Sequence, residues 1–184
     1  MPKNLQLFFF NIQMRKNRQN SKKCQNANKS STFYKKSQNI KLSCSIDAPI
    51  FFTLNGAEPT DNSFLYEDPI QIDSSTVLRA RIIQPGYMPD VIGNASIFIN
   101  EKNTLNVVSL IVAPKDLWRK RKGIYANFEK RGMEVPAFIE YFDTTKSGAF
   151  KLAFSKTTTT RIAGKTSRRQ PKKSFAFFAS NDDG

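Results

Sequence analysis

The 184-residue chain carries 29 Lys and Arg against 15 Asp and Glu, a net charge of +14, and it contains no His. The lack of His excludes a histidine general base and imidazole metal ligands, and two Cys are too few for a four-thiolate zinc site. Residues 1–45 hold ten Lys and Arg and no acid, and residues 119–184 hold fifteen against six acids, whereas residues 46–118 are net acidic. The charge distribution therefore predicts a mildly acidic folded centre between two basic segments.

Residues 1–37 are predicted to form a basic disordered tail, because they are rich in Asn, Gln, Ser and Lys and lack an apolar period. The apolar stretch at residues 5–10 is too short for a signal-peptide core, and no small-residue cleavage site follows it. No run in the chain approaches the roughly 20 apolar residues of a membrane helix. We therefore expect no membrane span and find no clear export signal. Cys24 and Cys44 could form a disulfide, although two unlinked thiols are favoured.

Residues 38–101 are predicted to form a small antiparallel β-sandwich of the immunoglobulin or fibronectin III type. Short segments of alternating or β-branched residues recur there at a spacing typical of sandwiches. The Asn55-Gly56 pair between two apolar runs indicates a turn, since both residues tolerate a positive φ. The expected strands are Ile40–Cys44, Ile50–Leu54, Pro69–Ile72, Thr76–Ile83 and Asn94–Ile99.

Residues 105–184 are predicted to contain a second set of strands. Pro114–Trp118 is expected to form a helical turn, with Pro and Asp at its start. Trp118 is expected to anchor a core, and the basic run Arg119–Lys122 is expected to be solvated. The expected strands of this part are Val107–Val112, Val135–Phe142, Gly148–Phe154 and Lys173–Ala179.

The sequence FFTLNGAEPT, followed by SFLYEDPIQIDSSTVLRARIIQPGY, resembles the β-sandwich module named after the C-terminal domain of chitobiase and β-hexosaminidase. The resemblance covers about residues 38–100. It implies a non-catalytic appendage of an extracellular or cell-surface protein, with a spacer or adhesive role. A carbohydrate-binding appendage is an alternative, and it would need an exposed aromatic strip formed by Phe51, Phe52, Tyr66 and Tyr87.

The sequences LNVVSLIVAPKDLWRKRKGIYAN, RGMEVPAFIEYFD and RIAGKTSRRQPKKSFAFFA are similar to the beginning of the CotH (spore-coat protein H) family of atypical protein kinases. This resemblance covers about residues 105–180. It implies a partial α+β kinase-like N-terminal lobe, with ATP and Mg²⁺ or Mn²⁺ as cofactors and protein Ser or Thr hydroxyls as acceptors. The catalytic acids of such a domain are expected downstream, and Asp182 and Asp183 cannot fill both roles. We therefore expect a truncated domain that has no turnover and no metal ligands of its own.

The basic segment 161–173 contains the candidate nucleotide- or phosphate-binding residues. Lys172 or Lys173 is the candidate phosphate-pairing lysine of the kinase-like interpretation. A P-loop is disfavoured, because Thr159 stands where that motif needs Gly, and one Gly typical of the CotH loop is also missing. A solvated basic hairpin is an equal alternative, and a polyanion or nucleic-acid binder using the tail and this loop is a further one. The candidate residues are Gly164, Lys165, Thr166, Ser167, Arg168, Lys172 and Lys173.

Overall fold

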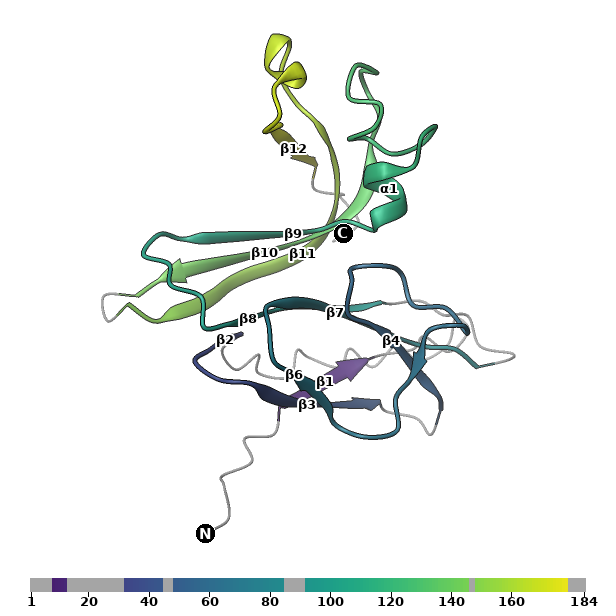
Figure 1. The fold of residues 1–184 in the computed structure, drawn as a ribbon, viewed down its shortest axis with the longest axis vertical. Coiled ribbons are helices and arrows are strands. Elements are labelled where there is room, and N and C mark those ends of the chain that lie inside the picture. The colour runs from purple at the N-terminus through teal and green to yellow at the C-terminus, as the bar shows by residue number, and fades with distance from the viewer. Residues whose placement is uncertain (1–7, 13–31, 45–47, 85–91, 146–147, 179–184) are drawn as a thin grey trace, which may run out of the picture.

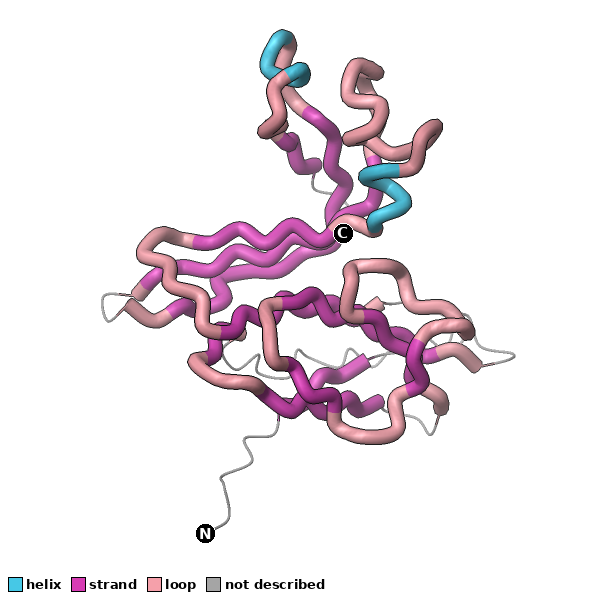
Figure 2. The backbone as a smooth tube through the Cα atoms, viewed as in Figure 1, coloured by secondary structure: helices cyan, strands magenta, loops and turns pink. Residues whose placement is uncertain are grey.

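The computed structural model describes residues 8–12, 32–44, 48–84, 92–145 and 148–178. These residues form three β-sheets and one short α-helix, so the chain is mainly β as the sequence predicts (Figures 1 and 2). Two of the sheets face each other around one core, and the third lies against the outside of this pair. Among the described residues, no helix has the length and apolar character needed to cross a bilayer.

The sandwich consists of a three-stranded and a five-stranded sheet. The first has the order β1-β3-β6, made by β1 (Phe8–Ile12), β3 (Gln38–Cys44) and β6 (Ile70–Ile72). The second has the order β2-β8-β7-β4-β5, made by β2 (Phe33–Tyr34), β8 (Gly93–Ile99), β7 (Thr76–Ile82), β4 (Ile50–Thr53) and β5 (Phe64–Leu65). Most neighbouring strands are antiparallel, but β1–β3 and β2–β8 are parallel, which corrects the expectation of a purely antiparallel sandwich.

The alternation in β3, β6 and β7 places every second side chain between the two sheets. Their inward residues are all buried, and β4 and β8 each add one Ile, so the core draws on both sheets. Burial of such aliphatic side chains stabilises a fold by roughly 1.5–3 kcal/mol each relative to full exposure. The buried core residues are Ile40, Leu42, Ile50, Ile70, Ile72, Leu78, Ala80, Ile82 and Ile97.

The segment 1–37 differs from the expected disordered tail where it is described. β1 pairs in parallel with β3 over residues 8–12, and β2 pairs in parallel with the end of β8. Both strands are made of Phe-rich sequence, which has high β propensity and stands apart from the polar remainder of the segment. The two short strands were not predicted because the segment as a whole has the polar composition of a disordered chain.

The third sheet is antiparallel, with the order β12-β11-β10-β9. Its strands are β9 (Val107–Ile111), β10 (Val135–Thr144), β11 (Phe150–Ile162) and β12 (Phe175–Phe178). The helix α1 (Pro114–Trp118) follows β9, and a 3-10 turn, η1 (Thr166–Arg169), lies between β11 and β12. The sequence predicted each strand of this sheet and the helical turn, although β11 extends eight residues beyond the predicted end at Phe154.

A polar and aromatic junction joins the third sheet to the sandwich. Glu140 of β10 is completely buried, and its Oε2 accepts a hydrogen bond from the Ser96 N–H of β8 at 2.7 Å. The Phe33 ring stacks on the Phe150 ring with centroids 4.1 Å apart, and it meets the Phe142 ring edge-on at 5.3 Å. Because the interface buries charge, hydrogen bonds and aromatic rings together, it fixes the orientation of the two parts.

Trp118 corrects another prediction. Its side chain is 59% exposed, so it does not anchor a core. Trp118 ends the single turn of α1 and contacts the Tyr125 ring with centroids 4.7 Å apart, and one ring contact cannot cover an indole. The small core of this region instead uses aliphatic residues, namely Val112, Ile124, Val135, Ala137 and Ile162. The basic run Arg119–Lys122 is exposed, as predicted.

Candidate phosphate-binding site

All seven candidate phosphate-binding residues lie in the connection between β11 and β12. Gly164 has a φ of +90°, a backbone conformation that favours glycine, and a Cβ added there would require the Ser167 hydroxyl to rotate away. The turn η1 then carries Thr166, Ser167 and Arg168. A single 3-10 turn of four residues differs from the long helix that follows a P-loop, which agrees with the sequence interpretation.

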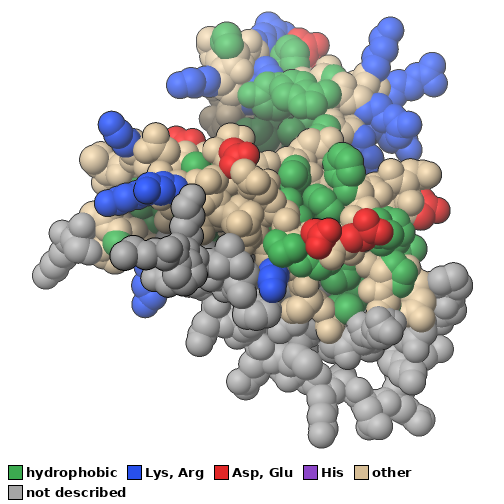
Figure 3. Space-filling view, turned by 60° about the horizontal axis from the view of Figure 1, so that its bottom comes forward, with side chains coloured by type: hydrophobic (Ala, Val, Ile, Leu, Met, Phe, Trp, Pro, Cys, Tyr) green, Lys and Arg blue, Asp and Glu red, His purple; other side chains and the backbone are tan. Residues whose placement is uncertain are grey.

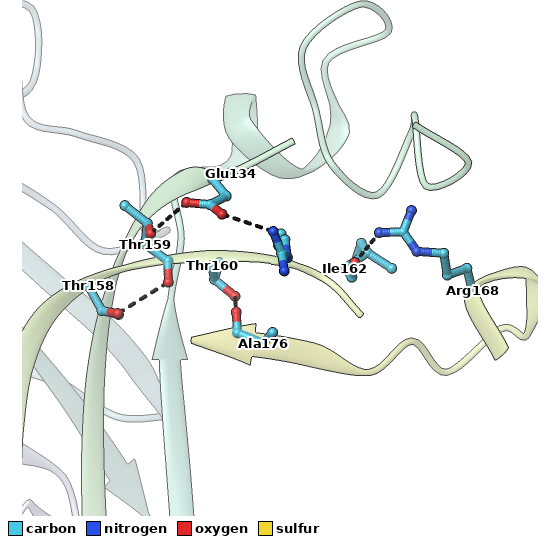
Figure 4. Close-up of polar contacts among 8 residues, drawn as sticks. Glu134, Thr158, Thr159, Thr160, Ile162, Arg168 and Ala176 are labelled. Atoms are coloured by element: carbon cyan, nitrogen blue, oxygen red, sulfur yellow. Dashed lines mark hydrogen bonds and ion pairs between the residues drawn. The ribbon is translucent and has the colours of Figure 1, made fainter. Parts of the chain in front are cut away.

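The end of β11 is tied to its neighbours by hydroxyl and ionic contacts (Figure 4). Thr158 Oγ1 donates to the Phe178 carbonyl at 2.7 Å, and Thr160 Oγ1 donates to the Ala176 carbonyl at 3.0 Å, so β12 is held by side chains as well as by its ladder. Thr158 and Thr160 are both buried. These bonds fix the strand that leads into the basic turn.

Arg168 joins the turn to the loop between α1 and β10. Its side chain is only 7% exposed. Nη1 donates to the carbonyls of Phe128 at 2.9 Å and Lys130 at 3.2 Å, and Nη2 donates to the Ile162 carbonyl. The guanidinium therefore satisfies three backbone acceptors on two segments that are far apart in sequence, and it serves to hold the two loops together.

Lys173 is also engaged within the protein. Its Nζ donates to the Arg168 carbonyl at 2.6 Å and to the Gln170 carbonyl at 3.1 Å. The same ammonium lies 3.9 Å from the centroid of the Phe128 ring, which is cation–π range. Of the two lysines considered for phosphate pairing, Lys172 is the one with an exposed side chain.

Two basic loops are thereby brought to one end of the third sheet. We call residues 119–131 and 163–173 the two basic loops. The Tyr125 hydroxyl donates to the Pro171 carbonyl at 3.4 Å, and Arg169 Nε lies 3.6 Å from Glu129 Oε1, so several contacts connect them. Many of the Lys and Arg side chains visible in Figure 3 project at the upper end of the molecule. The exposed basic residues of the two loops are Arg119, Lys120, Arg121, Lys122, Lys130, Arg131, Lys165, Arg169 and Lys172.

This arrangement suits an anionic ligand with several charges. Exposed ammonium and guanidinium groups make charge-assisted hydrogen bonds to phosphate oxygens, and many positive groups on one surface raise the local concentration of anions. Among the described residues, no group of three or more His, Cys, Asp or Glu side chains is placed to hold a metal ion. Sequence reasoning identified the 163–173 loop, but it did not connect this loop with residues 119–131. The buried part of the contact is made by Arg168, which the sequence does not distinguish from its basic neighbours.

The aromatic residues proposed for carbohydrate contact do not form an exposed strip in the described part of the chain. Phe52 and Tyr66 are half-buried and pack against the sandwich core, and Phe51 is half-buried as well. Tyr87 lies outside the described residues. Among the sandwich aromatics whose side chains are described, Phe64 is the most exposed, at 67%, and its ring centroid lies 5.6 Å from that of Phe52. Cys24 also lies outside the described residues, so the disulfide with Cys44 stays a prediction.

The fold defines a β-sandwich module that carries an additional antiparallel sheet. Comparison with protein families refines the class, because residues 29–92 match the family described as the chitobiase/β-hexosaminidase C-terminal domain. This match supports the first resemblance over residues 38–92, and β1 and β8 of the sandwich lie outside the matched range. Neither the curated proteins nor the solved structures contain a significant match to the chain. The similarity of residues 105–180 to the CotH family finds no support in these comparisons and stays a prediction.

Proposed function

We propose that this chain is a non-catalytic accessory module in which a chitobiase-type sandwich is joined to the first sheet of a CotH-like kinase domain. We further propose that the two basic loops of that sheet bind the phosphate groups of ATP. The observation that carries the proposal is the Arg168 contact, which gathers the exposed Lys and Arg side chains of both loops at one end of the sheet. Among the surfaces of the described residues, this one fits a triphosphate best, because it gathers the most positive side chains.

The residues of the 163–173 loop divide into two roles in this proposal. Lys165 and Lys172 are exposed and bind phosphate oxygens directly. Gly164 allows the tight turn, and Arg168 and Lys173 position it through backbone carbonyls. The hydroxyls of Thr166 and Ser167 are exposed on η1 and supply further donors.

In the CotH family, ATP with Mg²⁺ or Mn²⁺ supplies the phosphoryl group that is transferred to a protein hydroxyl. The proposal assigns to this chain the binding of the phosphates and no transfer. The sandwich contributes rigidity, because the buried contact between Glu140 and Ser96 fixes it to the same sheet. A sandwich held in this way acts as a spacer or adhesive module in an extracellular setting.

The test is calorimetric titration of the full chain with ATP in the presence of Mg²⁺ or Mn²⁺. The site variant is Lys165→Ala/Lys172→Ala. The control is Lys102→Ala/Lys151→Ala, which removes the same charge from exposed positions outside the two basic loops. We expect saturable binding that the site variant loses and the control retains. Equal weakening in both variants, or no binding by the parent chain, would contradict the proposal.

A polyanion binder is a second candidate, favoured by the exposed Arg119–Lys122 run next to the exposed Trp118. This surface can contact a chain of phosphates or sulfates without recognising a nucleotide. Heparin and single-stranded DNA distinguish the two functions. If they displace ATP at equal charge concentration and their binding falls steeply with salt, the polyanion function is correct and the nucleotide function is not.

A further inference from the structure

A cavity of about 280 Å³ lies at the junction between the sandwich and the third sheet. It is remote in sequence from the 163–173 loop, and an inference about it does not depend on the proposed function. Residues of the five-stranded sheet form one wall, and β9, β10, β11 and the start of α1 form the other. Junctions between packed units are common positions for small-molecule sites. The polar lining residues are Glu58, Arg79, Asn94, Asp116 and Thr157.

Arg79 is the central charged group of this cavity. Its side chain is only 9% exposed, and it is oriented by two bonds: Nε donates to Asn94 Oδ1 at 2.8 Å, and Nη1 donates to the Gly56 carbonyl at 3.0 Å. Among the described residues, no hydrogen bond of Arg79 uses Nη2. A buried guanidinium that is fixed in place and still has donors is a preorganised ligand-binding group, because little conformational entropy remains to be lost.

Two carboxylates, Glu58 and Asp116, lie near Arg79, and one of them also pairs with Lys115. Glu58 lies beside Lys115, whose Nζ is 2.6 Å from Glu58 Oε2, and this hydrogen bond lowers the pKa of the Glu58 carboxyl. Burial lowers the pKa of Arg79, while Glu58 and Asp116 act in the opposite direction. Counting Lys115, two cations and two carboxylates surround the cavity and their formal charges cancel, while the Asn94 amide is engaged by Arg79 and by the Ile92 carbonyl.

We propose that this cavity binds a neutral, hydroxyl-rich molecule, specifically a single sugar unit. Hydroxyl groups donate to the carboxylates of Glu58 and Asp116 and accept from Arg79, so one ligand satisfies groups of both signs. Because the charges around the cavity cancel, a charged ligand gains no net attraction there to offset the loss of its hydration, whereas a neutral ligand loses less on leaving water. Phe138 and Ile111 give the apolar wall against which the C–H face of a sugar ring packs.

The experiment follows the amide NMR spectrum of the full chain during titration with four probes. N-acetylglucosamine and glucose are neutral, glucuronate is anionic, and glucosamine is cationic. Thr157→Tyr is the blocking variant, because Thr157 is exposed at the cavity and a strand position tolerates an aromatic residue. Ser155→Tyr is the matched control, since Ser155 is exposed on the same strand, two residues away, and does not line the cavity.

We expect at least one neutral sugar to shift amides around the cavity with saturation in the millimolar range, which suits a small weak ligand. Glucuronate and glucosamine are expected to bind at least several-fold more weakly. Thr157→Tyr should abolish the shifts, and Ser155→Tyr should retain them. Titration with the trisaccharide of N-acetylglucosamine then identifies the source of the sugar. If the trisaccharide binds as tightly as the single unit, the cavity takes the end of a glycan; if only the single unit binds, it takes a free sugar.

Three results would overturn the proposal. One is the absence of saturable shifts with both neutral sugars. Another is unchanged binding in Thr157→Tyr, which would place the ligand elsewhere. The last is binding of glucuronate or glucosamine as tight as that of the neutral sugars, which would refute the charge argument. Arg79→Met is less informative, because loss of the buried bonds of Arg79 also affects folding.

Discussion

Replacing Glu140 with Leu should destabilise the junction between the sandwich and the third sheet. The carboxylate is completely buried and accepts the Ser96 N–H at 2.7 Å, in the range of a charge-assisted bond. Leu has no acceptor oxygen, so the Ser96 N–H loses the hydrogen bond to residue 140. A buried unsatisfied donor costs about 1–3 kcal/mol. Relief from burying a carboxylate offsets part of this, so we expect a net loss of about 1–2 kcal/mol.

The measurement is the free energy of unfolding in urea, with amide hydrogen exchange as a local readout at Ser96. Glu140→Gln keeps an acceptor oxygen of similar shape, so its loss should be smaller than that of Glu140→Leu. Asp143→Asn on the same strand is the control, and its exposed position predicts a change within about 0.5 kcal/mol. Unchanged stability and unchanged Ser96 exchange in Glu140→Leu would refute the argument that this bond holds the junction.

Three further perturbations test the turn and the sandwich. Gly164→Ala should lower the free energy of unfolding by roughly 1–3 kcal/mol, and Gly148→Ala by a similar amount, because both glycines have a positive φ and rotation of the Ser167 hydroxyl relieves the contact at Gly164. An unchanged free energy of unfolding in Gly164→Ala would contradict this. Arg168→Met should cost on the order of 2 kcal/mol by leaving backbone carbonyls unpaired, and an unchanged urea midpoint would contradict it. Burial raises the pKa of Tyr34 to about 12. Because the pKa of Tyr34 in the folded state exceeds the ordinary value of 10.0, the stabilising contribution of the neutral phenol is complete below pH 10 and is lost as the pH rises toward 12. An ultraviolet titration should show one tyrosine that ionises near pH 12, and Tyr34→Phe should lack this step.

Most strands were predictable because their local pattern decides them, but the short strands β1, β2 and β5 were not predicted. In β7 the apolar residues Leu78, Ala80 and Ile82 alternate with Arg79 and Arg81, and the apolar set faces the core as the period predicts. The same pattern implies that Arg79 faces solvent, yet it is buried. The third sheet covers that face of the strand, and this contact lies between segments whose pairing no local period encodes.

The candidate site was predictable in position but not in its division of roles. Arg168, Lys172 and Lys173 are equivalent in the sequence, since each is a cation in a basic run. Tertiary contacts separate them: carbonyls bind Arg168 and Lys173, and Lys172 stays exposed. For Trp118, the residue type alone gave the wrong burial. A single Trp favours a core position, but a one-turn helix beside a single aromatic ring leaves it exposed.

The most direct test of the account is amide NMR of the full chain during titration with ATP and Mg²⁺. The proposed site predicts that residues of both basic loops, 119–131 and 163–173, shift along one saturating curve, with the largest changes near Lys165 and Lys172. This result would show that the contacts of Arg168 create a single phosphate site from two distant segments. Shifts confined to one loop, or small unsaturated shifts spread over every basic segment of the chain, would contradict it.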